Sequence, residues 1–558
     1  MNAISFGTVS VPNNYGEIVL LPGDYYPGPN QGLVQLEANW RQAASPWVYR
    51  NVSVRGTGNV VIHGDSMGAN QQMIYLMGSG ISVRNITIKD SQHHGVYFNG
   101  STITHHHDVI VDSVTVDGAW GFGIYWSGYE RILAQNCVVN ETCKQNEFGS
   151  TCLWPSGLRG DDCWHVTFRN NIVSRNWGEG LNCSYCKYVD VADNVVFDNY
   201  SVNLYAHSVS KAMYRNNLVY NTDSTYWRYC YGSNGTAGAG VSIANELSCT
   251  YGCAGYTNSC GSSQSCCATT DYDHPTYTNV NYTQIDSLFI FNNFLFDCGI
   301  HLWDAFSGWG NFSYMNHIFI DNNTIIGKSG DSAVMHAPII FTFNTGYIYF
   351  SDIKLRNNIV SMDVTGPLSD EFNAWAAAPA CNTPWTNSFT ANGNLWSAMP
   401  TVPGVSFAGD QVSPTVLMHA VSGDTNNLTP SLAHPELVMA DAQIPWITDD
   451  FFHNPRMSTT NAGAVEYNAT ADVQANGSQF IPPSIFPNPA NDYFTVKIPS
   501  NTGSWNCTIM NANGQLVEMK SNLTGNTNVS TEGWATGVYF VQVSNSSRSY
   551  SMKVAVCR

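Results

Sequence analysis

The stretch NNIVSRNWGEGLNCSYCKYVDVADNVVFDNYSVNLYAHSVSKAMYRNNLVY (170–220) decides the fold. It repeats one pattern: a short alternating strand, a turn, a second strand, and a polar pair that ends in Asn. Asn171, Asn194 and Asn217 follow one another at intervals of 23 residues, the length of one coil in a stack of parallel strands. Asparagines stacked at one corner can hydrogen-bond along the stack. The repeat therefore predicts a parallel β-helix, right-handed by the crossover rule.

The first strand of each repeat has apolar or small residues at its second and fourth positions, as a half-buried strand requires. The segments are GVYFNG (95–100), GIYWSG (123–128), GLRGDD (157–162), GLNCSY (180–185), NLYAHS (203–208), GVSIAN (240–245), GIHLWD (299–304) and AVMHAP (333–338). The third and fifth positions then point outward. The third column contains Tyr97, Tyr125, Arg159, Asn182, Tyr205, Ser242, His301 and Met335. The fifth contains Asn99, Ser127, Asp161, Ser184, His207, Ala244, Trp303 and Ala337.

Composition narrows the classes of function. Charged residues make up only 11% of the 558 residues, which suits stacked strands covered by amides, hydroxyls and aromatic rings. The net charge of −18 argues against a nucleic-acid partner, because phosphate contacts need clustered Lys and Arg. The same acidic balance permits calcium binding without demonstrating it. No apolar run is long enough for a membrane span.

The 16 cysteines are crowded, and in an exported protein they predict disulfides that staple loops. One group is Cys137, Cys143, Cys152, Cys163, Cys183 and Cys186, and a second is Cys230, Cys249, Cys253, Cys260, Cys266 and Cys267. Zinc at Cys183 and Cys186 is disfavoured, because no second pair follows at suitable spacing. The second group lies in a Cys-rich insertion at about 226–286, which we expect to wall or cover the outward face.

After residue 467 the repeat stops, and 468–484 is a polar linker with prolines. The segments IFPNPANDYFTVKI (485–498), WNCTIMNANGQLVEMK (505–520) and GVYFVQVSNSSRSYSMKVAV (537–556) are short alternating strands separated by turns. They predict a small immunoglobulin-like β-sandwich over 485–558. The chain is therefore expected to be all-β, with a coil over 1–467 and a separate C-terminal sandwich.

Both units resemble known families. EIVLLPGDYY (17–26), WGEGLN (177–182), DNYSVNLYAH (198–207) and AGVSIANE (239–246) resemble the pectate-lyase-like superfamily of right-handed β-helices, over about 2–467. FPNPAND, NGQLV, GVYFVQV and the terminal KVAV closely resemble the C-terminal sorting domain of type IX secretion substrates. The first resemblance implies action on polysaccharides in many members, but fixes no reaction. The second implies a secreted protein, extracellular or on the outer cell surface, that engages the type IX secretion machinery.

The outward face of the first strands favours a glycan-binding groove. Tyr97, Tyr125, Tyr205 and Trp303 form a row of rings on which sugars would stack. Asn182, His301 and Asp304 add polar groups along the same line, where binding residues on a rigid scaffold gather. The alternative is that tyrosines are simply common in strands.

Two chemistries fit the charged residues of this face. In a lyase, Arg159 would neutralise a uronate carboxylate, His207 or Tyr205 would act as base, and acidic residues would hold calcium. In a hydrolase, Glu179 would pair with Asp161 or Asp162 across a glycosidic bond. GDDC (160–163) only weakly echoes polygalacturonases, since the accompanying motifs are missing. The histidines at 93–94 and 105–107 flank one rung and could bind a metal, although no nearby acid or cysteine clearly completes a site.

A third reading is a non-catalytic protein, either an adhesin or a structural subunit that self-associates through its coil. Low charge, abundant Asn, Thr and Tyr, and the lack of a decisive catalytic set favour it. Several Asn-x-Ser/Thr strings would also allow a glycoprotein, although such strings arise by chance in an Asn-rich chain.

Overall fold

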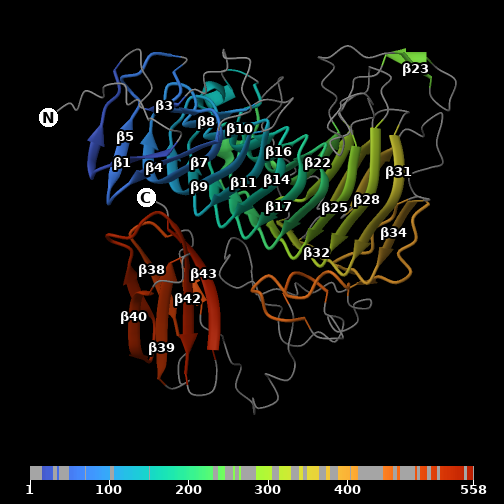
Figure 1. Cartoon of the computed structure of the whole chain (residues 1–558). Helices are drawn as coiled ribbons and strands as arrows, with labels where there is room; N and C mark the ends of the chain where they lie inside the picture. The colour runs from blue at the N-terminus through green and yellow to red at the C-terminus, as the bar shows by residue number, and fades with distance from the viewer. Residues whose placement is uncertain are drawn as a thin grey trace.

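The computed structural model shows an all-β chain in two parts, a long coil and a C-terminal sandwich (Figure 1). The residues that it describes are 15–28, 34–36, 49–69, 71–100, 106–149, 151, 153–229, 237–245, 255–257, 263–265, 284–304, 313–328, 339–343, 348–363, 372–376, 388–402, 404–412, 444–456, 462–465, 484–486, 490–498, 504–511, 516–545 and 549–556. Two 3₁₀ turns interrupt the strands, η2 (Lys144–Gly149) and η3 (Ser224–Tyr226). No helix in these ranges is long and apolar enough to cross a membrane.

A complete rung of the coil contains three strands, and each strand pairs in parallel with its counterpart one rung further on. β13 (Ser156–Asp161), β14 (Trp164–Arg169) and β15 (Ile172–Ser174) pair with β16 (Glu179–Ser184), β17 (Lys187–Ala192) and β18 (Val195–Phe197). The first strands form an 11-stranded parallel sheet, and the second and third strands form the other long sheet. The predicted right-handed parallel β-helix is confirmed.

The bounds of the remaining coil strands follow. The other first strands are β3 (Val34–Leu36), β6 (Ile74–Leu76), β8 (Val96–Asn99), β10 (Ile124–Ser127), β19 (Val202–His207), β22 (Ala239–Asn245), β27 (Ile300–Asp304), β30 (Ile339–Phe343) and β33 (Phe372–Ala376). The second and third strands are β1 (Tyr15–Leu20), β2 (Gly23–Tyr25), β4 (Tyr49–Gly56), β5 (Val60–His63), β7 (Ser79–Lys89), β9 (His106–Asp117), β11 (Tyr129–Gln135), β12 (Val138–Asn140), β20 (Ser210–Arg215), β21 (Leu218–Tyr220), β25 (Gln284–Phe291), β26 (Phe294–Phe296), β28 (Ser313–Asp321), β29 (Thr324–Lys328), β31 (Ile348–Arg356), β32 (Ile359–Asp363), β34 (Phe389–Asn392), β35 (Leu395–Trp396) and β36 (Gln411–Val412).

The register of the first strands agrees with the predicted columns as far as β27. Tyr97 pairs with Tyr125, and the column continues through Arg159, Asn182, Tyr205, Ser242 and His301. The next step was predicted wrongly, because His301 pairs with Ile340 and not with Met335. AVMHAP (333–338) placed a polar His336 inside, whereas the strand that follows places Ile339 and Phe341 there, both fully buried. Residues 333–338 themselves lie outside the described ranges.

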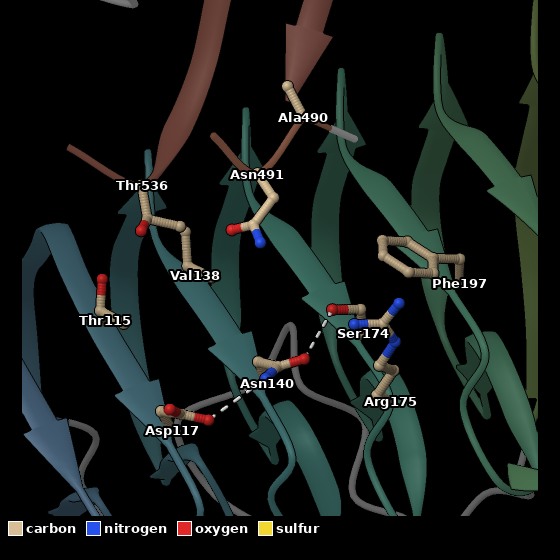
Figure 2. Close-up of a pocket in the computed structure, with 10 residues that line it drawn as sticks. All are labelled: Thr115, Asp117, Val138, Asn140, Ser174, Arg175, Phe197, Ala490, Asn491 and Thr536. Atoms are coloured by element: carbon tan, nitrogen blue, oxygen red, sulfur yellow. Dashed lines mark hydrogen bonds between the residues drawn. The ribbon is translucent and has the colours of Figure 1, made fainter. Parts of the chain in front are cut away.

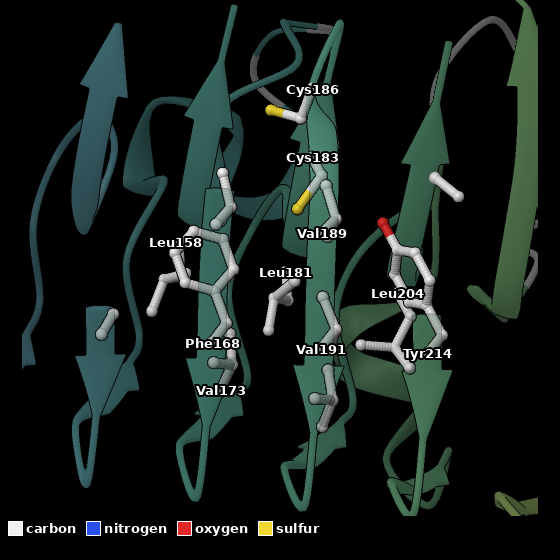
Figure 3. Close-up of a cluster of buried hydrophobic side chains, with 14 of the residues drawn as sticks. Leu158, Phe168, Val173, Leu181, Cys183, Cys186, Val189, Val191, Leu204 and Tyr214 are labelled. Carbon is white, nitrogen blue, oxygen red and sulfur yellow. The ribbon is translucent and has the colours of Figure 1, made fainter. Parts of the chain in front are cut away.

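The interior of the coil is a continuous apolar column, because the inward positions of successive rungs stack (Figure 3). Leu158, Leu181 and Leu204 occupy equivalent positions on three neighbouring first strands, and all are fully buried. The ring of Phe168 lies 5.4 Å from that of Trp126 on the preceding rung. Truncating one such leucine to alanine typically costs about 2–5 kcal/mol.

Buried asparagines form the ladder that the repeat predicts. Asn171, Asn194, Asn217, Asn293, Asn323, Asn358 and Asn394 are each linked to the next by hydrogen bonds. In each link the Oδ1 atom of one residue accepts both the backbone N–H and the side-chain amide of the residue before it, as Asn217 does from Asn194 at 3.0 Å. The ladder ends at Asp410, whose carboxylate accepts from Asn394 and from Nε1 of Trp396.

The disulfide prediction is wrong for the cysteines that the structure describes. Cys137, Cys143, Cys163, Cys183, Cys186, Cys298 and Cys507 are all buried and unpaired. The reason is the stacking of the coil: Cys183 takes an inward strand position, while Cys163 and Cys186 stack at one corner. Their Sγ atoms lie 3.2 Å from the carbonyl oxygens of Asp161 and Ser184, respectively. The remaining cysteines lie outside the described ranges.

The predicted insertion also needs correction. β22 is an ordinary strand of the coil, and it divides the region 226–286 into two parts. In the second part, β23 (Gly255–Thr257) and β24 (Ser263–Ser265) pair in antiparallel fashion.

The C-terminal unit is the predicted sandwich of two antiparallel sheets. One sheet contains β37 (Ser484–Phe486), β38 (Tyr493–Lys497) and β41 (Thr527–Ser530). The other contains β40 (Leu516–Leu523), β39 (Trp505–Asn511), β42 (Gly537–Ser544) and β43 (Ser549–Val556). Trp505 and Val541 are fully buried between the sheets, in a core separate from that of the coil.

Candidate functional site

Arg159 is the centre of the charged cluster on the first-strand face. Its Nη2 atom lies 3.5 Å from Oδ2 of Asp161, two residues along β13. Its Nη1 atom lies 3.8 Å from Oε2 of Glu179, which opens β16 on the next rung. Burial lowers the pKa of Arg159, but the two carboxylates outweigh that effect and raise it above its ordinary value. One permanently charged guanidinium is therefore held between two carboxylates.

Glu179 continues into a buried chain of polar groups. The hydroxyl of Ser156 donates to Oε2 of Glu179 at 2.8 Å, and the Asn182 side-chain amide donates to the same oxygen. Ser184 donates to the Asn182 carbonyl oxygen at 2.8 Å, and Nδ1 of His207 lies 3.1 Å from the Ser184 hydroxyl. The structure thus connects three of the residues predicted from the sequence, Glu179, Asn182 and His207.

The tyrosines of this face do not present open ring faces. The rings of Tyr97 and Tyr125 stack on each other with centroids 5.1 Å apart, and Phe122 stacks on the other side of Tyr125 at 4.5 Å. The rings therefore cover each other, and the Tyr125 hydroxyl donates to Oδ2 of Asp161 at 3.2 Å. Burial raises the pKa of Tyr97 to about 12, so it acts as a neutral hydrogen-bonding group.

Solvent reaches the predicted residues unequally. The side chain of Asp161 is 26% exposed, whereas that of Glu179 is only 6% exposed. Tyr205 and His207 are 3% and 5% exposed, so the prediction of an open ring at Tyr205 is wrong. Tyr205 instead belongs to a small apolar cluster with Val202 and Ala244.

The other residues predicted from the sequence do not take part in the Arg159 cluster or in the polar chain from Glu179. Asp162 occupies the turn after β13, with a φ of 52°, and its N–H donates to the carbonyl of Ser184. His301 is half-buried, and burial lowers its pKa to about 4, so its imidazole is neutral near neutral pH. Trp303 and Asp304 lie on β27, but their side chains are outside the described part of the structure.

Exposed aromatic rings do border this face, on loops that the column analysis did not consider. Trp120 is 50% exposed, Trp154 is 38% exposed and Tyr229 is 45% exposed. The carbonyl of Trp154 accepts a long hydrogen bond from Nη1 of Arg159 at 3.4 Å, and the guanidinium of Arg228 lies 4.4 Å from the Trp154 ring. The only sequence signal was the position of Trp120 and Trp154 just before β10 and β13.

The donor set does not fit a calcium ion. Calcium takes six to eight oxygen ligands, and here Asp161 and Glu179 flank a guanidinium that would repel a divalent cation. No group of three or more His, Cys, Asp or Glu residues placed to hold a metal occurs among the described residues. Glycan cleavage at this cluster would therefore not use calcium.

Comparison with known families identifies both parts of the chain. Residues 73–263 match the model of the right-handed β-helix region, and residues 484–557 match that of the secretion system C-terminal sorting domain. The chain is therefore a right-handed β-helix protein with a type IX secretion sorting domain, and it is a secreted protein of the extracellular space or cell surface. The narrower resemblance to pectate lyases is not shown by these matches.

Comparison with curated proteins yields no match, whereas several solved structures match, among them three of low identity. The Dettilon tailspike protein matches with a TM-score of 0.27 and 11% identity, over 60% of this chain and 62% of its own. A tailspike from Acinetobacter baumannii bacteriophage Fri1, a capsular polysaccharide depolymerase, matches with 0.23 and 12%, over 97% and 74%. The catalytic domain of an α-1,3-glucanase with bound tetrasaccharides matches with 0.22 and 13%, over 70% and 64%. This chain thus spans less than two-thirds of the first tailspike.

Proposed function

We propose that this secreted protein binds a neutral polysaccharide on its first-strand face and hydrolyses it with the carboxylates beside Arg159. The observation that carries the proposal is the position of Arg159 between Asp161 and Glu179. When all three groups are ionised, the cluster has one more negative than positive charge. Such a cluster favours the positive charge that develops on a sugar ring during hydrolysis.

The same cluster disfavours a lyase. Proton removal beside a uronate requires a cation that neutralises the sugar carboxylate. Among the described residues of the first strands the one Lys or Arg is Arg159, and its charge is already balanced by Asp161 and Glu179. The nearby guanidinium of Arg228 lies against the Trp154 ring. The overall charge of −18 would further oppose an acidic glycan.

Asp161 is the carboxylate that we place at the scissile bond, because it is the more accessible of the two. Glu179 is more deeply buried and accepts hydrogen bonds from Ser156 and Asn182. We propose that it affects the site by partly neutralising the charge of Arg159. The exposed rings of Trp120 and Trp154 supply the flat apolar surfaces on which sugars stack. Binding without cleavage is the second candidate, because the near-complete burial of Glu179 limits its contact with a substrate.

The test is a degradation and binding screen of the full chain on neutral and uronate-containing polysaccharides, with one arm containing calcium. We expect new reducing ends from a neutral glycan. Asp161→Asn should lower the rate by about a hundredfold or more, while Glu130→Gln, which removes an exposed carboxylate paired with Arg131 on β11, should not.

Each outcome of the screen has one meaning. Unsaturated products from a uronate-containing glycan would overturn the hydrolase in favour of a lyase. Binding without products, weakened by Trp154→Ala, would support the second candidate. Neither binding nor products on any glycan would refute both, and would leave the structural-subunit alternative.

A further inference from the structure

A segment near the end of the coil runs along one corner, between the second and third strands. The outward residues of this corner have positive φ and are Asn170, Asp193, Asn216, Asn292, Asn322 and Asn357. All of them except Asn170 hydrogen-bond to residues 449–453 or to Gly463. The amides of Asn216 and Asn292 donate to the carbonyls of Asp450 and Asp449, and the N–H of Gly463 donates to the carbonyl of Asn357. We call residues 444–456 and 462–465 the strap, and the corner is its docking strip.

Asp193 belongs to the same corner but has a second partner. Its Oδ1 atom lies 2.8 Å from Nε2 of His453 on the strap. The same oxygen lies 2.9 Å from Nζ of Lys553, which comes from β43 of the sorting domain. The side chains of Asp193 and Lys553 are each only 15% exposed, and Nζ of Lys553 also lies 5.0 Å from the ring centroid of Phe451. One carboxylate thus joins the coil, the strap and the sorting domain.

Around this contact the two parts of the chain are separated by cavities. One cavity, of about 360 Å³, lies between third strands of the coil and Ala490, Asn491 and Thr536 of the sorting domain (Figure 2). Its coil side combines the apolar Val138 and Phe197 with polar groups, among them Asn140, which donates to Asp117 and accepts from Ser174. A second cavity, of about 900 Å³, has Trp534 and Tyr539 on the sorting-domain side. Loosely filled contacts that mix polar and apolar groups are typical of interfaces that open, unlike the dry interface of an obligate pair.

We propose that the sorting domain docks on the flank of the coil as a releasable unit, and that Asp193 is the anchor of this dock. Because the ion pair is mostly buried, removing either Asp193 or Lys553 leaves an inward-facing polar group with fewer partners. Release would also uncover Val138 and Phe197, which are each 3% exposed and border the smaller cavity. The inference is independent of the proposed function.

Small-angle X-ray scattering of the full chain tests the dock. We expect a compact particle for the natural sequence and for Lys553→Arg, which keeps the charge. Lys553→Met and Asp193→Asn should each give a larger radius of gyration and stronger binding of an apolar fluorescent dye. The matched controls are Lys520→Met, which removes a lysine paired with Glu518 on β40, and Asp352→Asn, which removes a carboxylate paired with Lys354 on β31. Both should scatter like the natural sequence.

Two results would show that Asp193 does not anchor the sorting domain. If the natural chain is already extended, or if both anchor variants remain as compact as their controls, the sorting domain is not held by Asp193. Circular dichroism of Asp193→Asn checks that the coil has folded. Lys553→Met changes only the sorting domain, so it keeps the test valid if the coil variant is unstable.

Discussion

Burial inside the coil controls the reactivity of the thiols of Cys163, Cys183 and Cys186. Burial raises the pKa of the Cys163 and Cys186 thiols well above the usual range, and only thiolates react readily. We therefore expect that iodoacetamide at mildly alkaline pH leaves these cysteines unmodified in the native protein. After unfolding in urea the same residues should be labelled fully, as measured by mass spectrometry of the peptides.

The urea-treated sample is the control, because it shows that the reagent is active and that the peptides are recovered. The labelling of each cysteine is compared before and after unfolding. A disulfide-linked peptide that contains one of these three residues would contradict the structure. So would rapid labelling before unfolding, since it would require the rungs to open locally.

Each asparagine of the ladder should contribute about as much to stability as a buried leucine of the coil. In Asn217→Ala, the backbone and side-chain N–H groups of Asn194 lose their acceptor, and the carbonyl of Val191 loses a donor. Each buried polar group left unsatisfied costs about 1–3 kcal/mol, so we expect a loss of about 3 kcal/mol or more. The midpoint of denaturant unfolding measures it.

Asn140→Ala is the matched control for the ladder variant. Asn217 directly precedes the third strand β21, whereas Asn140 is the last residue of the third strand β12. Asn140 is half-buried and bonds to Asp117 and Ser174 outside the ladder. Its removal should cost about 1 kcal/mol. Equal costs for the two variants would show that the ladder is no more important than a surface hydrogen bond.

At the scale of strands, the 23-residue repeat of the sequence was enough to predict which residues of successive first strands lie side by side. A 23-residue coil places Arg159, Asn182 and Tyr205 in one column, because strands of equal rungs must stack in register. The period says nothing about what covers a column, so the burial of Tyr205 and His207 was missed. It also says nothing about residues outside it, and Trp154 precedes its strand on a loop.

At the scale of the whole molecule, composition separated the coil from the sorting domain but could not show that they touch. Asp193 and Lys553 are 360 residues apart in the chain, and neither belongs to a recognisable motif. Asp193 is one of several polar residues at its corner, and only the fold shows that a lysine of β43 meets it. Contacts between independently folded parts depend on surfaces, which repeats and sorting motifs do not encode.

The strap should hold the coil less firmly as the pH rises, because protonated His453 joins the strap to Asp193 of the coil. Hydrogen bonds to Asp193 and Asp449 raise the pKa of His453 from 6.5 to about 9, although burial and the nearby Lys553 oppose the shift. Arg215 also faces these carboxylates. Asp193 and Asp449 belong to the coil and the strap, so the raised pKa stabilises the strap on the coil and not the docked sorting domain. This stabilisation is complete below pH 6.5 and is lost as the pH rises through about 9.

We therefore expect the midpoint of denaturant unfolding of the natural chain to fall between neutral pH and a pH above 9, as His453 loses its proton. His453→Gln should unfold at a lower denaturant concentration at neutral pH and should change little over the same range, because it has no charge to lose. If the midpoint of the variant fell with pH as much as that of the natural chain, another group would control the response. Lys553 would then be the first to examine, since its ammonium is the other cation on Asp193.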